Sequence, residues 1–173
     1  MLSTLILTGT CGSGKTTIST LLATQMGWKR ISEDDIWHDY FGKNRGAFGT
    51  EKHRLKRKRV HETVFTHILS AHRAAKNVVI DATVHETPPE AYNEYRDFFE
   101  KHGIKWRICI LNPRLEVVVA RDSQRKDWVA GVERIEQLRT KFSGKVFNKE
   151  WFIDNSDDTP EQTMSRIIQS GAA

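Results

Sequence analysis

Residues 5–17, LILTGTCGSGKTT, contain the pattern that decides the fold. The apolar run at 5–7 is typical of a buried strand, and the pattern G-x-x-x-x-G-K-[ST] follows it. Glycines in such a loop let backbone N–H groups point at a polyphosphate, and the helix that follows adds the positive end of its dipole. The lysine brings charge to the β- and γ-phosphates, and the next threonine offers a hydroxyl to Mg²⁺. The predicted nucleotide site comprises Gly9, Thr10, Cys11, Gly12, Ser13, Gly14, Lys15, Thr16 and Thr17, with Thr16 as a metal ligand.

Short apolar runs alternate with amphipathic segments along the whole chain. Further strands are predicted at 78–80, 108–111 and 151–153, with a weaker one near Arg30-Ile31. Helices are predicted at 15–26, 50–76 and 90–102, where apolar residues recur at steps of three and four. This strand–helix alternation indicates an α/β fold with a mostly parallel sheet.

Helix boundaries are marked by capping residues. Gly103 is a typical helix stop. Asn112-Pro113 predicts a helix whose first residue is the proline. Thr159-Pro160 predicts another, and Gln162 completes a capping box for this last helix.

Length and composition favour one compact domain over residues 1–173. The chain has 173 residues, 38% hydrophobic and 28% charged, which is typical of a globular protein. No apolar run approaches the ~20 residues of a membrane span, and Leu2 to Leu7 is too short for a signal peptide. Two cysteines make no disulfide framework, so we expect a reducing cytoplasm.

The net charge of +5 is concentrated in one segment. The stretch 52–61, KHRLKRKRVH, has six Lys or Arg residues and no acid; without it, the chain has 21 basic and 22 acidic residues. Such a segment favours a local anionic partner, such as phosphate or nucleic acid. A solvated helix face is the alternative.

An acid pair follows the weak strand, in the segment Ser32-Glu33-Asp34-Asp35. Ser32 and Asp35 fit a capping-box spacing, which gives Asp35 a structural role at a helix start. Asp34 has no such role and lies beside the predicted phosphate site. A kinase needs a carboxylate that accepts the proton of the attacking hydroxyl. We predict that Asp34 is this catalytic base and that it contacts the acceptor.

The apolar strand 78–80 ends in Asp81. A carboxylate at this place suits a group that helps to hold Mg²⁺ or orients the acceptor, although acids at strand ends also serve as simple caps. Thr83 follows it closely and is predicted, with Asp81, to contact the acceptor.

Arg121 and Arg125 are four residues apart, so they share a helix face. Transfer of a phosphoryl group needs cations that close over it, and a mobile lid would also exclude water. We predict a lid over approximately residues 122–135. A solvated arginine pair is the alternative.

These segments together resemble a P-loop kinase of the small, lidded type, and the kinase domain of 5′-polynucleotide kinases is the most similar group. The matching segments are GTCGSGKTT, SEDD, VVIDAT, RDSQR and VERIEQLRTKF, which cover roughly residues 2–145. The resemblance implies a three-layer α/β/α sandwich with five parallel strands and magnesium-ATP as donor. It also implies Asp34 as general base, Lys15 and Arg125 as catalytic residues on the transferring phosphoryl group, and Arg121 near the donor nucleotide.

Two departures from that family lie on the acceptor side. Trp37 stands where the family has an arginine that holds an acceptor phosphate, and the family's Asp-Thr-Asn strand end is Asp81-Ala82-Thr83 here. The acceptor therefore stays open between a nucleic-acid 5′-hydroxyl and a small molecule, as in gluconate or shikimate kinases. Trp37 could stack on a base or sugar, as could Tyr40, or both could pack in the core.

Three other interpretations stay open. Phe41 to Gly49 could form an acceptor-side loop, with Lys43, Arg45, Arg54 and Arg57 reaching an anionic acceptor, or an ordinary connection. The protein could be a nucleotide switch or hydrolase that needs no acceptor. It could also be a basic binding module whose nucleotide site has lost its function. The sequence does not determine the oligomeric state.

Overall fold

The computed structural model describes residues 2–42, 50–86, 89–126, 128–142 and 145–170. Within these ranges one sheet contains five parallel strands, as predicted. They are β1 (Thr4–Gly9), β2 (Lys29–Ser32), β3 (Val78–Asp81), β4 (Trp106–Leu111) and β5 (Phe152–Ile153), and their order across the sheet is β2-β3-β1-β4-β5.

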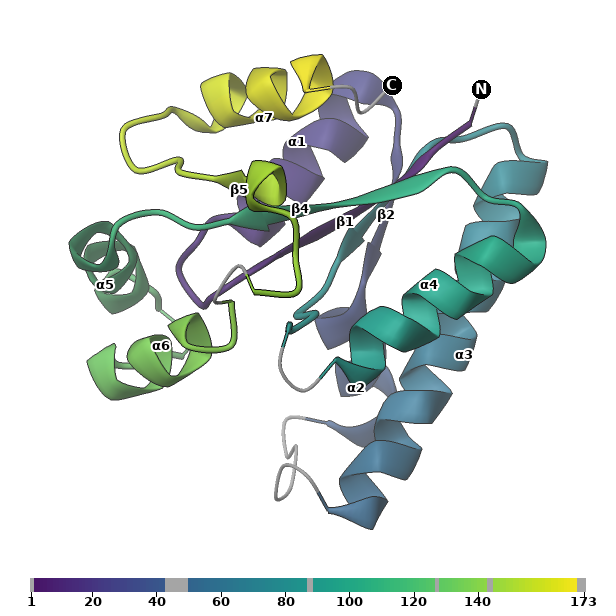
Figure 1. Cartoon of the computed structure of the whole chain (residues 1–173), viewed down its shortest axis with the longest axis horizontal. Coiled ribbons are helices and arrows are strands. Elements are labelled where there is room, and N and C mark those ends of the chain that lie inside the picture. Colours follow the sequence, from purple (N-terminus) through teal and green to yellow (C-terminus); the bar gives the residue numbers. More distant parts are fainter. Residues whose placement is uncertain (1, 43–49, 87–88, 127, 143–144, 171–173) are drawn as a thin grey trace.

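Helices cover both faces of the sheet, which makes the predicted three-layer sandwich (Figure 1). α1 and α7 lie on one face, α3 and α4 lie on the other, and α5 and α6 lie beyond the carboxyl ends of the strands. The helices are α1 (Lys15–Met26), α2 (Glu33–Phe41), α3 (Glu51–Arg73), α4 (Glu90–His102), α5 (Leu115–Ser123), α6 (Val132–Arg139) and α7 (Pro160–Gln169), with a 3₁₀ turn η1 (Lys149–Trp151) before β5.

The core has two parts because successive strand residues face opposite sides of the sheet. In β1, Leu5 and Leu7 belong to the cluster that packs α1 and α7, whereas Ile6 belongs to the cluster under α3 and α4. All three side chains are fully buried. A parallel sheet covered on both faces needs apolar residues at every position, which explains the unbroken apolar runs of its central strands.

Two predicted helix boundaries are wrong. The third helix ends at Arg73 and not at residue 76, since Ala75 adopts a positive φ of 54°. The fifth begins at Leu115 and not at Pro113, because Arg114 is extended. Its N–H donates to Ser156 Oγ at 2.7 Å, and its guanidinium pairs with Asp157 at 2.7 Å. The predicted stop at Gly103 and the capping box at Thr159 are confirmed.

The strand register brings the predicted site residues to one edge of the sheet. Asp81 pairs in register with Ser32 of β2 and with Leu7 of β1. Asp34 and Thr83 therefore lie just beyond the same edge, beside the loop that follows β1. None of the described helices is long and apolar enough to cross a membrane.

Candidate active site

The loop between β1 and α1 is held in shape by close backbone contacts. Gly9 has a φ of 144°, and a Cβ there would lie 2.4 Å from the carbonyl oxygen of Leu111. Gly12 has a φ of 75°, and a Cβ there would lie 2.7 Å from the carbonyl oxygen of Val118 in α5. The phosphate-loop pattern leaves position 12 free, so the need for glycine there comes from packing against α5.

This loop has the chemistry of a phosphate cradle. Lys15 Nζ donates to the carbonyl oxygens of Gly9 and Thr10 at 2.9 Å each, which holds the ammonium group across the loop. The hydroxyls of Thr10 and Ser13 are buried and have no hydrogen-bond partner in the described part of the chain. These hydroxyls can donate to phosphate oxygens, and the Lys15 ammonium group and the start of α1 add positive charge beside them. The loop therefore suits a polyphosphate.

Oxygen atoms suited to Mg²⁺ lie next to the loop. Thr16 is exposed on the first turn of α1. Ser19, one turn further on, donates to the Thr16 carbonyl at 3.1 Å and to Asp81 Oδ2 at 3.2 Å. A hydroxyl and a carboxylate are ligands that Mg²⁺ uses together with phosphate oxygens and water. The residues thus fit the cation, although no group of three or more His, Cys, Asp or Glu that could hold a metal occurs among the described residues.

Arg30 connects three elements at this edge and was not predicted as a site residue. Its Nε donates to Ser19 Oγ at 2.9 Å, its Nη1 to Asp35 at 3.0 Å and its Nη2 to Asp81 at 2.9 Å. The guanidinium therefore links α1, α2 and β3. The sequence contains no signal for this role, because its partners are 5, 11 and 51 residues away.

Helix α2 starts directly at the edge of the sheet. Ser32 caps it by accepting the N–H of Asp35 at 3.1 Å, as predicted. The carboxylate of Asp35 pairs with Arg30, so the second half of the predicted capping box is replaced by an ion pair. Asp34, in the first turn, is exposed.

A buried charged cluster lies behind this helix start. His61 of α3, only 2% exposed, lies between two carboxylates: its Nε2 is 3.1 Å from Glu33 Oε1, and its Nδ1 contacts Glu94 Oε2. Tyr95 donates to Glu33 at 2.6 Å. Burial opposes protonation of His61, but the hydrogen bonds with Glu33 and Glu94 outweigh it and raise its pKa to about 9. Burial opposes ionisation of Glu33, but His61 outweighs it and lowers the pKa of this carboxyl.

The region predicted as a lid is organised by a buried acid. Asp122, 1% exposed, accepts the N–H groups of Ala130 and Gly131 at 2.8 and 3.0 Å, which joins α5 to the start of α6. Arg125 lies in the segment between α5 and α6. Its Nη1 is 3.8 Å from Asp122 Oδ1, and its guanidinium is 5.6 Å from the ring centre of Trp128. Residue 127 lies outside the described residues.

Arg121 is tied to the segment that follows β5. It donates to the carbonyl oxygens of Asn155 and Ser156 at 3.0 and 3.4 Å. Asn155 in turn donates to the carbonyl oxygen of Ser13 at 3.1 Å. Arg121 therefore reaches the phosphate loop through one buried side chain, and Asn155 is a site neighbour that sequence reasoning missed.

The aromatic residues of α2 have different environments. Trp37 is 5% exposed and packs in the core against Phe41 and His53. This burial argues against the interpretation that Trp37 stacks on an acceptor. Tyr40 is 40% exposed, and its hydroxyl is 2.7 Å from that of Thr63. Thr83 is exposed at the edge of the sheet.

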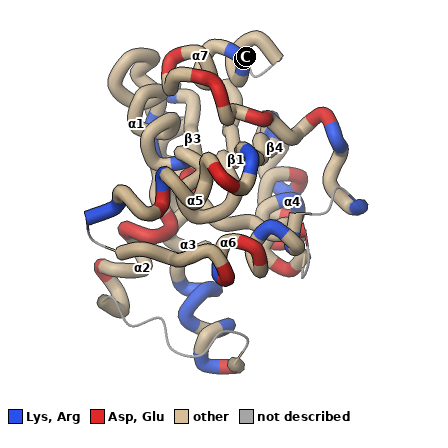
Figure 2. The backbone as a smooth tube through the Cα atoms, turned by 90° about the vertical axis from the view of Figure 1, so that its left-hand side faces the viewer, with Lys and Arg blue, Asp and Glu red and all other residues tan. Residues whose placement is uncertain are grey.

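The basic segment forms the first half of α3 (Figure 2). Three of its six cations make contacts within the protein: Arg57 pairs with Glu94 at 3.3 Å, Lys56 lies 4.7 Å from the ring centre of Phe41, and Arg59 lies 4.7 Å from that of Tyr40. The other three, Lys52, Arg54 and Lys58, are exposed. For these three cations, an anionic partner and a solvated helix face both stay open as interpretations. In the loop Phe41 to Gly49, residues 43–49 lie outside the described residues, including Lys43 and Arg45.

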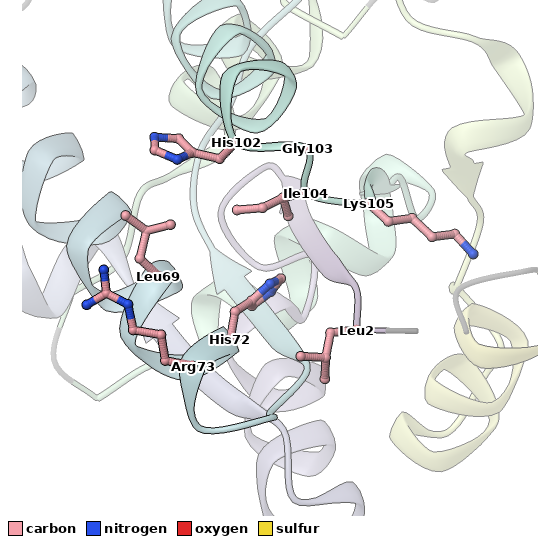
Figure 3. A pocket seen from close by; sticks show the side chains of 8 residues that line it. All are labelled: Leu2, Leu69, His72, Arg73, His102, Gly103, Ile104 and Lys105. Carbon is pink, nitrogen blue, oxygen red and sulfur yellow. The ribbon is translucent and has the colours of Figure 1, made fainter.

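A hollow of about 470 Å³ lies at the opposite edge of the sheet, between the ends of α3 and α4 (Figure 3). Leu2, Leu69 and Ile104 line it, together with His72, which is 3.0 Å from the Thr4 hydroxyl. The side chains of His102 and Lys105 extend away from its centre. No predicted site residue lines this hollow, so it is separate from the candidate site.

A phosphate cradle at the carboxyl edge of a five-stranded parallel sheet, with two helices beyond it, defines a P-loop kinase-like fold. The chain belongs to the family of AAA domains, whose match covers residues 5–144. No curated protein matches the sequence significantly.

Solved structures show the same fold. A tunicamycin resistance protein of Deinococcus radiodurans aligns with a TM-score of 0.72 and 16% identity over 100% of this chain and 98% of its own. A sugar kinase of a Janibacter species aligns with a TM-score of 0.68 and 18% identity, over 98% of this chain and 94% of its own. A chain of the Pnkp1/Rnl/Hen1 RNA repair complex aligns with a TM-score of 0.58 and 21% identity, over 82% of this chain and 45% of its own. At 16–21% identity, these likenesses show the fold and do not single out one member.

Proposed function

We propose that the protein is an ATP- and Mg²⁺-dependent kinase that transfers the γ-phosphoryl group to a hydroxyl acceptor. The observation that carries this proposal is that the phosphate loop and Asp34 share one edge of the sheet. They follow β1 and β2, which are separated by β3, so the strands that carry them are about 10 Å apart. That spacing leaves room for a phosphoryl group and an acceptor between loop and carboxylate.

The donor side would be formed by the phosphate loop and its neighbours. Lys15 and the loop N–H groups bind the phosphates, and Thr16 with Asp81 would hold Mg²⁺, which neutralises charge on the phosphates when bound. Arg30 holds the Asp81 carboxylate in place through its 2.9 Å contact. Arg121 is placed beside the loop by Asn155 and assists the donor nucleotide.

Asp34 is the proposed base on the acceptor side. Its exposed carboxylate accepts the proton of the attacking hydroxyl, while Arg125 of the lid offers positive charge to the transferring group. Catalysis would then consist of positioning and electrostatic stabilisation.

Two acceptor classes follow from different observations. The exposed cations Lys52, Arg54 and Lys58 favour a polynucleotide with a 5′-hydroxyl, because nucleic-acid phosphates need such a surface. Trp37 favours a small molecule, because an apolar side chain stands at this position and offers no cation to an acceptor phosphate. Its burial in the core also leaves no surface there for an acceptor. A nucleotide hydrolase without an acceptor remains the alternative class.

The decisive experiment is phosphotransfer from γ-labelled ATP with Mg²⁺. One acceptor set contains DNA and RNA oligonucleotides with 5′-hydroxyls, and the other contains nucleosides, sugars and antibiotics. We expect label on one set, and a loss of roughly 100-fold or more in transfer rate for Asp34→Asn, because general bases contribute about 10²- to 10⁴-fold. Asp39→Asn is the control: it makes the same change at an exposed position of the same helix.

Two results would contradict the proposal. Full transfer by Asp34→Asn would remove this residue from the base role. Free phosphate formed at one rate, whatever acceptor is added, would make the protein a hydrolase.

A further inference from the structure

One peptide group of the phosphate loop is held by a side chain from the other end of the chain. Asn155, only 3% exposed, donates from its Nδ2 to the carbonyl oxygen of Ser13 at 3.1 Å, and the contact is buried. A Cβ at Gly14 would lie 3.7 Å from the same nitrogen. The Asn155 amide therefore lies against the peptide group that joins Ser13 to Gly14.

This contact sets the direction of the Gly14 N–H. A peptide group is planar and trans, so its carbonyl and its N–H point in opposite directions. With the Ser13 carbonyl directed at Asn155, the Gly14 N–H points away from it and makes no hydrogen bond with any described residue. The Ser13 N–H, by contrast, is used inside the loop, where it donates to the Thr10 carbonyl at 3.3 Å. The Gly14 N–H is thus available to a phosphate oxygen at the start of α1.

The same peptide group could turn over if nothing held it. Gly14 has a φ of 101°, and glycine adopts positive and negative φ about equally well. A reversed peptide would direct the Ser13 carbonyl oxygen, and not the Gly14 N–H, at a bound phosphate, and the two oxygens would repel each other. A donor that holds the carbonyl from behind therefore selects the orientation that binds an anion.

The backbone around Asn155 is itself fixed. Arg121 of α5 donates to the Asn155 carbonyl at 3.0 Å, and Arg166 of α7 donates to the Asp154 carbonyl at 2.8 Å. The Asn155 Oδ1 is buried and has no partner in the described part of the chain, so the side chain is used there for the Ser13 contact alone. An amide on an anchored backbone can serve as a stationary donor.

We propose that Asn155 is a positioning residue for the donor nucleotide, which keeps the Gly14 N–H directed at a phosphate. This inference rests on the proposed function and deepens it, because it concerns the same phosphate site. In this role Asn155 acts through the loop backbone and touches neither the base nor the phosphates. Its effect on binding therefore does not depend on the base.

The first test compares the binding of two magnesium complexes by calorimetry, AMP-PNP and inorganic tripolyphosphate, which has no base. Asn155→Leu is similar in size to the wild-type residue and donates nothing. We expect it to weaken both ligands by the same factor of about tenfold or more, because hydrogen bonds to charged groups are among the stronger ones. Asn148→Leu is the matched control: it also removes an amide that bonds to backbone, at an exposed position, and should bind like wild type. Asn155→Ala is measured in the same way if Asn155→Leu does not fold.

The second test observes the Gly14 N–H directly by NMR. In wild type its proton resonance should move downfield on saturation with Mg²⁺ and AMP-PNP, because the group then donates to a phosphate. At saturation of Asn155→Leu we expect less than half of that shift. The amide of Gly27, beyond the other end of α1, is the reference and should keep its position in both proteins. An equal Gly14 shift in both proteins would overturn the inference.

The affinities separate this inference from the kinase proposal. Tripolyphosphate binding by Asn155→Leu at wild-type strength would overturn the positioning role alone, and a loss confined to AMP-PNP would do so as well, because Asn155 would then serve the base. Wild-type protein that binds neither ligand would overturn both proposals. If both ligands show the expected loss but no acceptor is phosphorylated, the positioning role stands and the kinase proposal fails.

Discussion

Gly12 illustrates how a single residue is constrained by packing that its motif does not encode. The phosphate-loop pattern requires glycine at positions 9 and 14 and accepts any residue at 12. In the structure Gly12 has a φ of 75°, and its α-carbon faces the Val118 carbonyl of α5. The loop and α5 are therefore in direct contact at this residue.

We expect Gly12→Ala to lower both nucleotide affinity and stability. The new methyl would lie 2.7 Å from the Val118 carbonyl oxygen, so the loop or α5 must move. Strain of this kind costs about 1–3 kcal/mol. Urea unfolding and calorimetric titration with AMP-PNP measure the two effects. Gly27→Ala is the control: its φ of 69° is similar, but nothing lies within 4 Å, so AMP-PNP should bind it as it binds wild type. Equal effects of the two substitutions would show that the contact with Val118 is unimportant.

At the scale of elements, α2, α3 and α4 are joined by the cluster around His61. The ring bridges Glu33 at the start of α2 and Glu94 in α4, and Tyr95 adds a 2.6 Å hydrogen bond to Glu33. Glu33 precedes Asp34 directly, so this cluster holds the turn that carries the proposed base. Breaking such a buried charge pair by removing one partner is costly, because the other charge stays buried.

The His61 cluster predicts a pH-dependent stability. The pKa of His61 is about 9 in the folded chain, above its usual value of about 6.5. The stabilisation is therefore fully present below about pH 6.5 and is lost as the pH rises through about 9. Between pH 6.5 and 8.5 the wild-type free energy of unfolding should fall by up to about 2–3 kcal/mol.

Urea unfolding across this pH range measures the effect. His61→Gln should lose most of the slope, whereas His67→Gln, at an exposed position of the same helix, should keep it. A slope in His61→Gln equal to that of wild type would place its origin elsewhere in the chain.

At the scale of the whole molecule, the candidate donor site combines segments from both ends of the chain. The phosphate loop near the amino terminus contacts Asn155 near the carboxyl terminus, and Arg121 of α5 bonds to the same segment. A nucleotide bound there would connect α1, α5 and the segment after β5. Binding should therefore stabilise the whole domain and not only the loop.

Mg²⁺ with AMP-PNP should raise the melting temperature. At a ligand concentration about 100 times Kd, binding adds about 2.7 kcal/mol, which for a domain of this size corresponds to roughly 5–11 °C. Differential scanning fluorimetry measures the shift. Lys15→Met should remove most of it, because Lys15 bridges the loop and offers the phosphates a charge. A wild-type shift that survives in Lys15→Met would mean that the nucleotide binds at another place.

The sequence by itself determined the elements and the phosphate loop, because both depend on neighbours a few residues apart. The five strands, the helix stop at Gly103 and the capping box at Thr159 follow from local periodicity and local hydrogen bonds. Asp34, Arg121 and Arg125 could be named from their place in the chain, but their roles remain predictions.

Only the tertiary structure decided which side chains meet. Arg30 holds Asp81 from 51 residues away, and Asn155 reaches Ser13 across 142 residues. The start of α5 was misplaced for the same reason, since Arg114 is held extended by Ser156. These contacts depend on strand order and on the approach of separate chain segments. A hydrogen bond or an ion pair between distant residues leaves no periodic trace in the sequence, because it requires only that two complementary groups arrive at the same place.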